Sequence, residues 1–192
     1  MSLVSGGNLT STAVEEETVV PLNGLILLST VTAASAATVD IEVTFDAKYD
    51  NYVLIGNNLL VSQSNVTLDC LFKLDGAYST SNYEFHTSRT KANSASYSAV
   101  NGTSQNRIKV LPPFRTDSRR TANFTLRTFV PSDPTLHKQI TSEGSCVDGS
   151  SGVVSSVFCA GMNTDTGALT GLRFKAAGGT LSGTFTLYGL IK

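Results

Sequence analysis

The segment Ala168–Lys192 alternates apolar and polar side chains, and this pattern constrains the fold more than any other stretch of the chain. A Gly178-Gly179 pair divides the segment into two strands. In the second strand apolar side chains share one face and polar side chains the other: Leu181, Phe185, Leu187 and Ile191 against Thr184, Thr186 and Tyr188. A period of two residues is typical of a half-buried strand and not of a helix.

Further strand patterns follow one another from Leu22 onward. They cover Leu22–Thr30, Thr38–Phe45, Asn51–Val61, Val66–Leu74, Arg107–Leu111, Ala122–Val130, Lys138–Ser142, Gly152–Ala160 and Ala168–Lys175. Turn-forming pairs separate them, and no segment has an amphipathic helical period. The pattern predicts an all-β fold, an antiparallel two-sheet β-sandwich that is jelly-roll-like.

Three details refine this prediction. Leu22–Thr30 is a nearly continuous apolar run, so we expect a strand that is covered on both faces. Gly56-Asn57-Asn58 interrupts an apolar strand and predicts a bulge or bend. Pro112-Pro113 is expected in a turn after Arg107–Leu111.

The length of 192 residues suits one domain, which we place at residues 21–192. Residues 1–20 are polar and contain the acidic run Glu15–Glu17. They are expected to be either a disordered lead or a short extended N-terminal arm that docks on a neighbouring subunit.

Charged residues make up 15% of the chain and the net charge is −1, which argues against nucleic-acid binding. No apolar run approaches the length of a membrane span, and the first residues lack the pattern of a signal peptide. We therefore expect synthesis in a cytosol, without membrane insertion. Cys146 and Cys159 flank a Gly-Ser turn where they can face each other, but the odd count favours three free thiols, with Cys70 in the core.

The longest polar stretch between strands, Gly76–Gln105, is expected to be an exposed functional loop. Tyr78, Tyr83 and Tyr97 lie in it, and a tyrosine ring can stack on a sugar while its hydroxyl forms hydrogen bonds. We assign these tyrosines and Arg89 as candidate ligand-binding residues. The alternative, tyrosines that pack on strand ends, is of equal weight.

A second candidate site is the basic segment that holds Arg115, Arg119 and Arg120. Guanidinium groups bind carboxylates and phosphates in a bidentate manner, so these residues are candidates for an anion site or a subunit contact. A solvated loop that Asp117 partly neutralises is the alternative.

No catalytic arrangement emerges from the sequence. His86 and His137 are the two histidines, and neither has a partner at the spacing of a metal site. The carboxylates that a glycosidase needs are present only in or beside turns: Asp46, Asp50, Asp75, Glu84, Asp133, Glu143 and Asp148. We expect no cofactor, no metal and no enzymatic activity.

Four segments resemble bacteriophage virion proteins of the tail-fibre tip and receptor-binding type. They are Leu27–Val43, Lys48–Phe85, Ala168–Phe174 and Ser182–Lys192, the last reading SGTFTLYGLIK. The resemblance covers most of the chain from Leu25 onward. It implies a β-sandwich carried on the virion in a symmetric oligomer, with a homotrimer expected.

This resemblance predicts a tail-fibre tip or receptor-binding knob that recognises a host surface polysaccharide. Its other partners are expected to be further phage virion proteins. Only some twenty residues precede the resembling region, so two alternatives stay open. One is a capsid decoration or cement protein, and the other is a short head fibre that stabilises the particle through subunit contacts.

Overall fold

The computed structural model describes residues 24–45, 48–117 and 119–191, which form thirteen β-strands and, within those ranges, no helix. The pairings between these strands are antiparallel. The predicted all-β, antiparallel class is therefore confirmed. The expected N-terminal arm, residues 1–20, lies outside the described residues.

The strands vary from two to thirteen residues in length. They are β1 (Leu25–Ala36), β2 (Val39–Glu42), β3 (Tyr49–Val61), β4 (Val66–Leu74), β5 (Ala77–Tyr78), β6 (Tyr83–Lys91), β7 (Ser94–Gln105), β8 (Ile108–Arg115), β9 (Ala122–Phe129), β10 (Lys138–Asp148), β11 (Val154–Asn163), β12 (Leu169–Ala176) and β13 (Leu181–Ile191).

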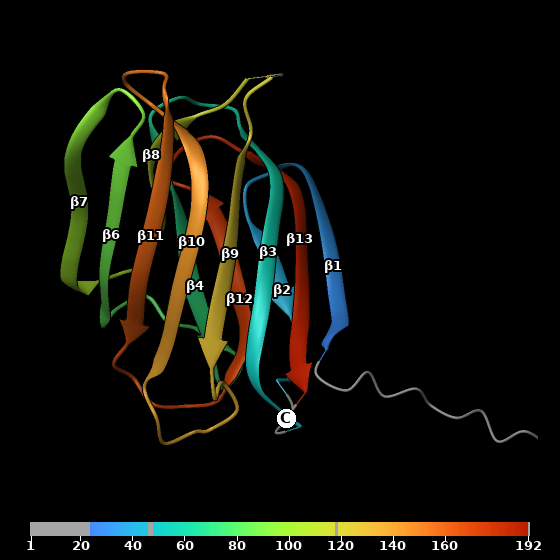
Figure 1. Ribbon diagram of the computed structural model, residues 1–192. Coiled ribbons are helices and arrows are strands. Elements are labelled where there is room, and N and C mark those ends of the chain that lie inside the picture. The colour runs from blue at the N-terminus through green and yellow to red at the C-terminus, as the bar shows by residue number, and fades with distance from the viewer. Residues whose placement is uncertain (1–23, 46–47, 118, 192) are drawn as a thin grey trace, which may run out of the picture.

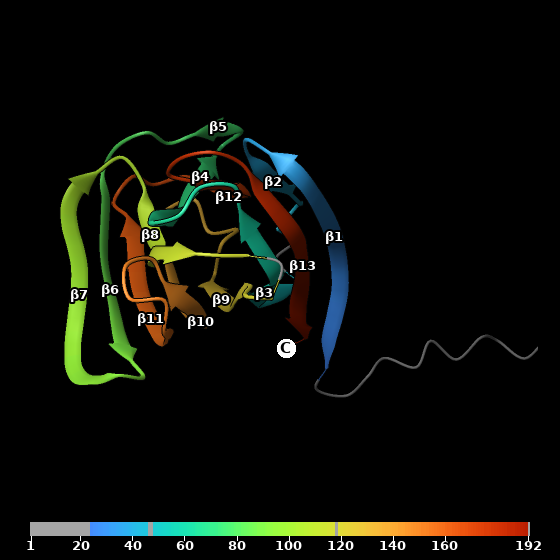
Figure 2. The ribbon, with the colours of Figure 1, turned by 90° about the horizontal axis from the view of Figure 1, so that it is seen from above.

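Backbone pairing connects the strands into one nearly closed sheet. Its main path runs β1-β13-β3-β9-β10-β8-β4-β12-β2, while β11, β6 and β7 extend from β10 and β5 pairs with β4. Figure 1 shows β7, β6, β11, β10, β9, β3, β13 and β1 as a row of long strands, with β8, β4, β12 and β2 behind it. Figure 2 shows the same arrangement from above. We call the surface of the long row that faces away from β4 and β12 the outer face.

Aromatic and aliphatic side chains fill the space between the row and the strands behind it. Phe124, Phe174 and Phe185 form a ring cluster, with the centroids of Phe174 and Phe185 5.2 Å apart. Each contributes about 1.5–3 kcal/mol through the apolar area that it removes from water. In β13, Leu181, Phe185 and Leu187 are fully buried, which confirms the alternation predicted for this strand.

The prediction that Leu22–Thr30 is covered on both faces is wrong for the part that the structure describes. β1 pairs with β13 on one side, and Leu25 and Leu27 on the outer face are exposed. An apolar run shows that a strand is apolar on both faces, but it cannot show whether both faces are covered. That depends on the place of the strand in the sheet, and β1 lies at its end.

The prediction of a long loop at Gly76–Gln105 is also wrong. Most of this stretch forms β5 and the β6–β7 hairpin, whose register runs from Tyr83↔Gln105 to Lys91↔Ser94. Pairing of β6 with β11 and β7 satisfies its backbone groups without a turn-rich loop. The stretch reads as polar because much of its surface is open to solvent.

The prediction of a turn at Pro112-Pro113 is wrong as well, because both prolines lie inside β8. They fall at an irregularity where the β4 register shifts between Val66↔Phe114 and Leu68↔Leu111. A proline has no N–H to donate to a sheet, so it is tolerated where the ladder is already interrupted. The bulge predicted near Gly56 is confirmed by the register shift between Gly56 and Leu59, with Asn58 at a φ of 53°.

The three cysteines are buried and free, as predicted. Cys146 lies opposite Ser155 and Cys159 lies opposite Ser142, so the two thiols on this hairpin do not face each other. Burial raises the pKa of the Cys70 thiol well above its usual value. The thiol therefore stays protonated and acts as a small core side chain.

Candidate functional site: a trough on the outer face

A shallow trough of about 440 Å³ lies across the outer face of β10, β11, β6 and β7. It is open to solvent along its length and crosses four neighbouring strands. Its lining residues are Glu84, Phe85, His86, Asn101, Gly102, Thr103, Gln139, Ile140, Thr141, Ala160, Gly161 and Met162. We call this feature the trough.

The strand register explains why the outer face is hollow here. Thr141, Ala160, His86 and Asn101 lie side by side in one cross-strand row. Ala160 contributes only a methyl group to this row, so the surface drops between the longer side chains on either side of it. Beneath, Gly161 leaves room for Ile108, because a Cβ at Gly161 would lie 2.8 Å from the Ile108 side chain.

His86, which lines the trough, forms a hydrogen-bonded pair with Tyr97, which lies beside the lining residues on β7. The distance from His86 Nε2 to Tyr97 Oη is 2.6 Å, and the two rings lie within 18° of parallel. Tyr97 is 61% exposed, so the bond to His86 orients a ring whose surface is open to solvent. A ring that is already held in place loses less conformational entropy when a ligand stacks on it.

Uncharged polar groups provide most of the hydrogen-bonding capacity of the trough. Asn101 and Gln139 carry amides, and Thr103 and Thr141 carry hydroxyls. Each amide can donate and accept, and so can each hydroxyl. Glu84 is the one acidic residue in the lining and no Lys or Arg lines it, so the trough suits a hydroxyl-rich ligand that carries no negative charge.

An exposed phenylalanine, Phe158, extends this surface beside the trough. It is 52% exposed on the outer face of β11 and lies between Glu143 of β10 and Ser88 of β6. Two smaller depressions, of about 170 and 390 Å³, both include Phe158 in their walls. The sequence places Phe158 in a strand, but alternation alone does not show which face is outward, so Phe158 was missed.

The three candidate tyrosines do not come together. Tyr97 lies at the trough, whereas Tyr83 is fully buried in the core, which corrects its assignment as a ligand-stacking residue. The Phe72 N–H donates to Tyr83 Oη at 2.7 Å, and Tyr83 Oη donates to the Ser79 carbonyl at 3.2 Å. Burial raises the pKa of Tyr83 well above its usual value, so its hydroxyl remains a donor.

Tyr78 lies away from the trough, on the strands behind the long row. The Arg173 guanidinium lies 3.8 Å from the centre of the Tyr78 ring and covers it. Burial, chiefly, raises the pKa of Tyr78 to about 12. Tyr78 therefore does not share a site with Tyr97, and its role in ligand binding stays a prediction.

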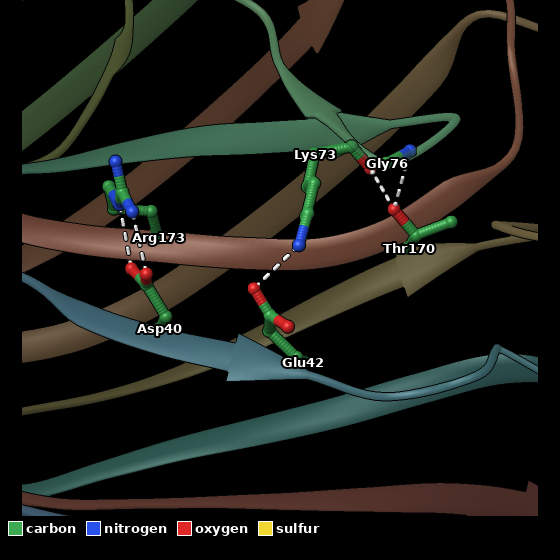
Figure 3. Close-up of polar contacts among 6 residues, drawn as sticks. All are labelled: Asp40, Glu42, Lys73, Gly76, Thr170 and Arg173. Carbon is green, nitrogen blue, oxygen red and sulfur yellow. Dashed lines mark hydrogen bonds and ion pairs between the residues drawn. The ribbon is translucent and has the colours of Figure 1, made fainter.

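The cations of two cross-strand ion pairs, Lys73 and Arg173, lie over the Tyr78 ring. The two pairs connect β2 to β4 and β12, as Figure 3 shows. Arg173 donates to both carboxylate oxygens of Asp40, at 2.7 and 2.6 Å, and Lys73 Nζ donates to Glu42 at 2.6 Å. Hydrogen bonding from Arg173 lowers the pKa of Asp40. Because each cation already has a carboxylate partner, we interpret these ion pairs as structural contacts that hold the three strands together.

Arg89, the fourth candidate ligand-binding residue, is also committed to internal contacts. It forms an ion pair with Asp148, and its Nη1 donates to the Pro113 carbonyl at 3.1 Å. Its Nε donates to Ser98 Oγ at 3.1 Å. The structure therefore gives Arg89 a role in joining β6 to β8 and β10, which corrects its assignment to the ligand surface.

The arginines of the basic segment lie in different surroundings. Arg115 is half-buried against Gly152 at the end of β8. Arg119 and Arg120 are exposed, and Arg120 Nε lies 3.6 Å from the Asp117 carboxylate within a turn. The anion or subunit contact assigned to these three residues stays a prediction.

Among the residues that the structure describes, no group of three or more His, Cys, Asp or Glu side chains is placed to hold a metal ion. His86 belongs to the trough, and His137 is exposed beside a separate depression near Leu136. In the same described ranges, no helix has the length and apolar character needed to cross a membrane.

No protein-family model, curated protein or solved structure matches this chain. The trough therefore has to be interpreted from its own geometry. It offers an oriented aromatic ring, amides, hydroxyls and one carboxylate on a shallow surface open to solvent. Such a surface can hold an extended ligand by hydrogen bonds and ring stacking.

Proposed function

We propose that this chain is a bacteriophage virion protein that recognises a host surface glycan through the trough on β6, β7, β10 and β11. The observation that carries the proposal is the amide- and hydroxyl-rich trough, with the His86–Tyr97 pair beside it. On this proposal the protein is a tail-fibre tip or receptor-binding knob. It binds its ligand and does not transform it.

The chemistry of the trough favours a carbohydrate. A sugar ring presents hydroxyls that both donate and accept, and Asn101, Gln139 and Thr141 can do the same. A sugar ring also has an apolar C–H face, which can lie against Tyr97. An open trough suits a long polysaccharide chain, whereas a small molecule needs an enclosed pocket to bury most of its surface.

The virion assignment is supported by the resemblance of Leu27–Val43, Lys48–Phe85 and the C-terminal segments to phage fibre-tip proteins. Such proteins act in several copies, and we propose a homotrimer on the virion. Several weak sites on one particle bind a repeating polysaccharide with much higher avidity than one site alone.

We further propose that the fold is a jelly roll with insertions. A jelly roll places its first, eighth, third and sixth strands in one sheet and its second, seventh, fourth and fifth in the other. If β5, β6, β7, β10 and β11 are set aside, the remaining strands pair as β1-β13-β3-β9 and β2-β12-β4-β8, which is that order. The trough then lies entirely on inserted strands.

Binding is tested first on an array of neutral and acidic bacterial polysaccharide fragments, with the full chain as probe. We expect neutral fragments to bind. Calorimetry with the best fragment then compares three variants. Ala160→Phe fills the floor of the trough and should abolish measurable binding, and Tyr97→Phe, which loses the bond to His86, should weaken it about threefold to tenfold.

The matched control is Tyr188→Phe, which removes a phenol hydroxyl from the same outer face far from the trough, next to Leu27 in the cross-strand row. It should bind like the unchanged chain. The proposal is overturned if no fragment binds, or if Ala160→Phe, shown by circular dichroism to be folded, binds as tightly as the unchanged chain.

A further inference from the structure

A stripe of exposed apolar side chains lies at the other end of the outer face, along β1 and β13. Leu25, Leu27 and Leu190 are 46%, 60% and 37% exposed. In the strand register Leu25 is opposite Leu190, and Leu27 is opposite Tyr188. These side chains therefore form one continuous surface and are not scattered leucines.

The surface continues across β3 to β9. Leu190 lies opposite Asn51, which lies opposite Phe129, and Phe129 is 38% exposed. In the next row Tyr188 lies opposite Val53. We define the apolar stripe as Leu25, Leu27, Val53, Phe129, Tyr188 and Leu190. Asn51 lies between Leu190 and Phe129, and the exposed Arg127 borders the stripe opposite Val53. Contiguous exposed apolar surface of this kind marks an interaction site.

The strand that borders the stripe is itself unprotected. β1 is twelve residues long and contains neither a charged residue nor a proline. Within the described residues it pairs with β13 on one side, and no strand pairs with its other side. Edge strands normally carry charges or prolines that prevent pairing with another chain, and β1 has neither.

We propose that the apolar stripe and the edge of β1 form the interface between copies of this chain. Each copy carries both parts of such an interface, namely apolar side chains that can pack against a neighbour and a strand edge whose N–H and C=O groups can bond to a neighbour. A net charge of −1 adds little repulsion between copies. A different protein would have to supply both complements, whereas a second copy already has them.

The position of the stripe also suits assembly. Leu27 and Asn101 lie at opposite ends of one cross-strand row that spans eight strands. Contact through the stripe therefore leaves the trough of each copy uncovered. This last argument rests on the proposed function, but the interface itself does not.

Analytical ultracentrifugation of the full chain over a range of concentrations tests the interface. We expect an assembly of two or more copies. The double variant Leu27→Glu with Leu190→Glu should raise the dissociation constant at least about tenfold, because carboxylates would be buried at the interface. The control Val154→Glu places the same charge at an exposed apolar site on β11 and should assemble like the unchanged chain.

The inference is overturned if the full chain is monomeric, if the double variant assembles unchanged, or if Val154→Glu also dissociates. A shortened chain that starts at Asn23 is measured as well. If the full chain is monomeric but the shortened chain assembles, the stripe is instead a binding surface for residues 1–22. Thermal unfolding checks that the variants are folded. The double variant should keep the calorimetric affinity of each trough, so failure of the interface and failure of glycan binding are distinguishable.

Discussion

Asp148 shows how a single residue holds strands together at one end of the trough-bearing hairpins. Its side chain is 1% exposed and forms ion pairs with Arg89 and Lys91. Burial opposes its ionisation, but hydrogen bonds from the Ser151 N–H and hydroxyl and these ion pairs outweigh burial. The pKa of Asp148 therefore lies well below its usual value.

This shift predicts the acid sensitivity of the fold. A carboxylate whose pKa is lower in the folded state stabilises that state above its ordinary pKa of 3.8, and the stabilisation is lost as pH falls through the folded value. Asp148→Asn leaves Arg89 and Lys91 without a buried counter-charge and should lower the free energy of unfolding by about 3 kcal/mol at neutral pH.

Urea unfolding between about pH 2 and about pH 6 measures this effect. The difference between Asp148→Asn and the unchanged chain should shrink as the pH falls. Asp117→Asn is the matched control, because Asp117 is exposed beside Arg120 and should contribute little. A difference that stays constant with pH would contradict the role given to Asp148.

At the scale of elements, the sequence predicts which stretches are strands better than it predicts where they lie. The bounds of β4 match the predicted Val66–Leu74, and β13 buries the predicted face. Three sequence predictions are wrong for the same reason. The exposure of β1, the pairing of β6 with β11 and the place of Pro112-Pro113 in β8 all depend on contacts between segments far apart in the sequence.

The same limit applies to the candidate site. Tyr97 and His86 both fall in the stretch predicted to be functional, but Ala160, Thr141 and Gln139 come from strands more than thirty residues away, and only the β10–β11–β6 register brings them together. Tyr83 and Tyr97 look equivalent in the sequence. In the structure one lies in the core and the other is 61% exposed, because they belong to opposite faces of the hairpin.

The assignment of inner and outer faces predicts that a leucine-to-alanine substitution lowers the free energy of unfolding by very different amounts at two positions. Leu187→Ala removes a fully buried side chain of β13 and should lower the free energy of unfolding by about 2–5 kcal/mol. Leu27→Ala removes a side chain that is 60% exposed in the single chain. Denaturant unfolding of the dissociated protein should show a change within about 0.5 kcal/mol for Leu27→Ala. Equal losses from the two variants would mean that the faces of β1 or β13 are wrongly assigned.

At the scale of the whole molecule, the outer face divides into two ends with different chemistry. The β1–β13 end is apolar and borders an edge strand without charges or prolines, and the β6–β7 end is hollow and rich in hydroxyls and amides. On the proposed jelly-roll path, the strands that carry the trough are insertions between the fourth and fifth and between the sixth and seventh strands. Insertions on a rigid scaffold are where binding surfaces commonly reside.

The most direct test of glycan recognition at the trough is hydrogen exchange of the full chain with and without the best neutral fragment from the array. We predict slower exchange in β6, β7, β10 and β11, with β2, β4, β5 and β12 unchanged. Slower exchange around Tyr78 and Arg173, or along β1, with the trough strands unaffected, would contradict it.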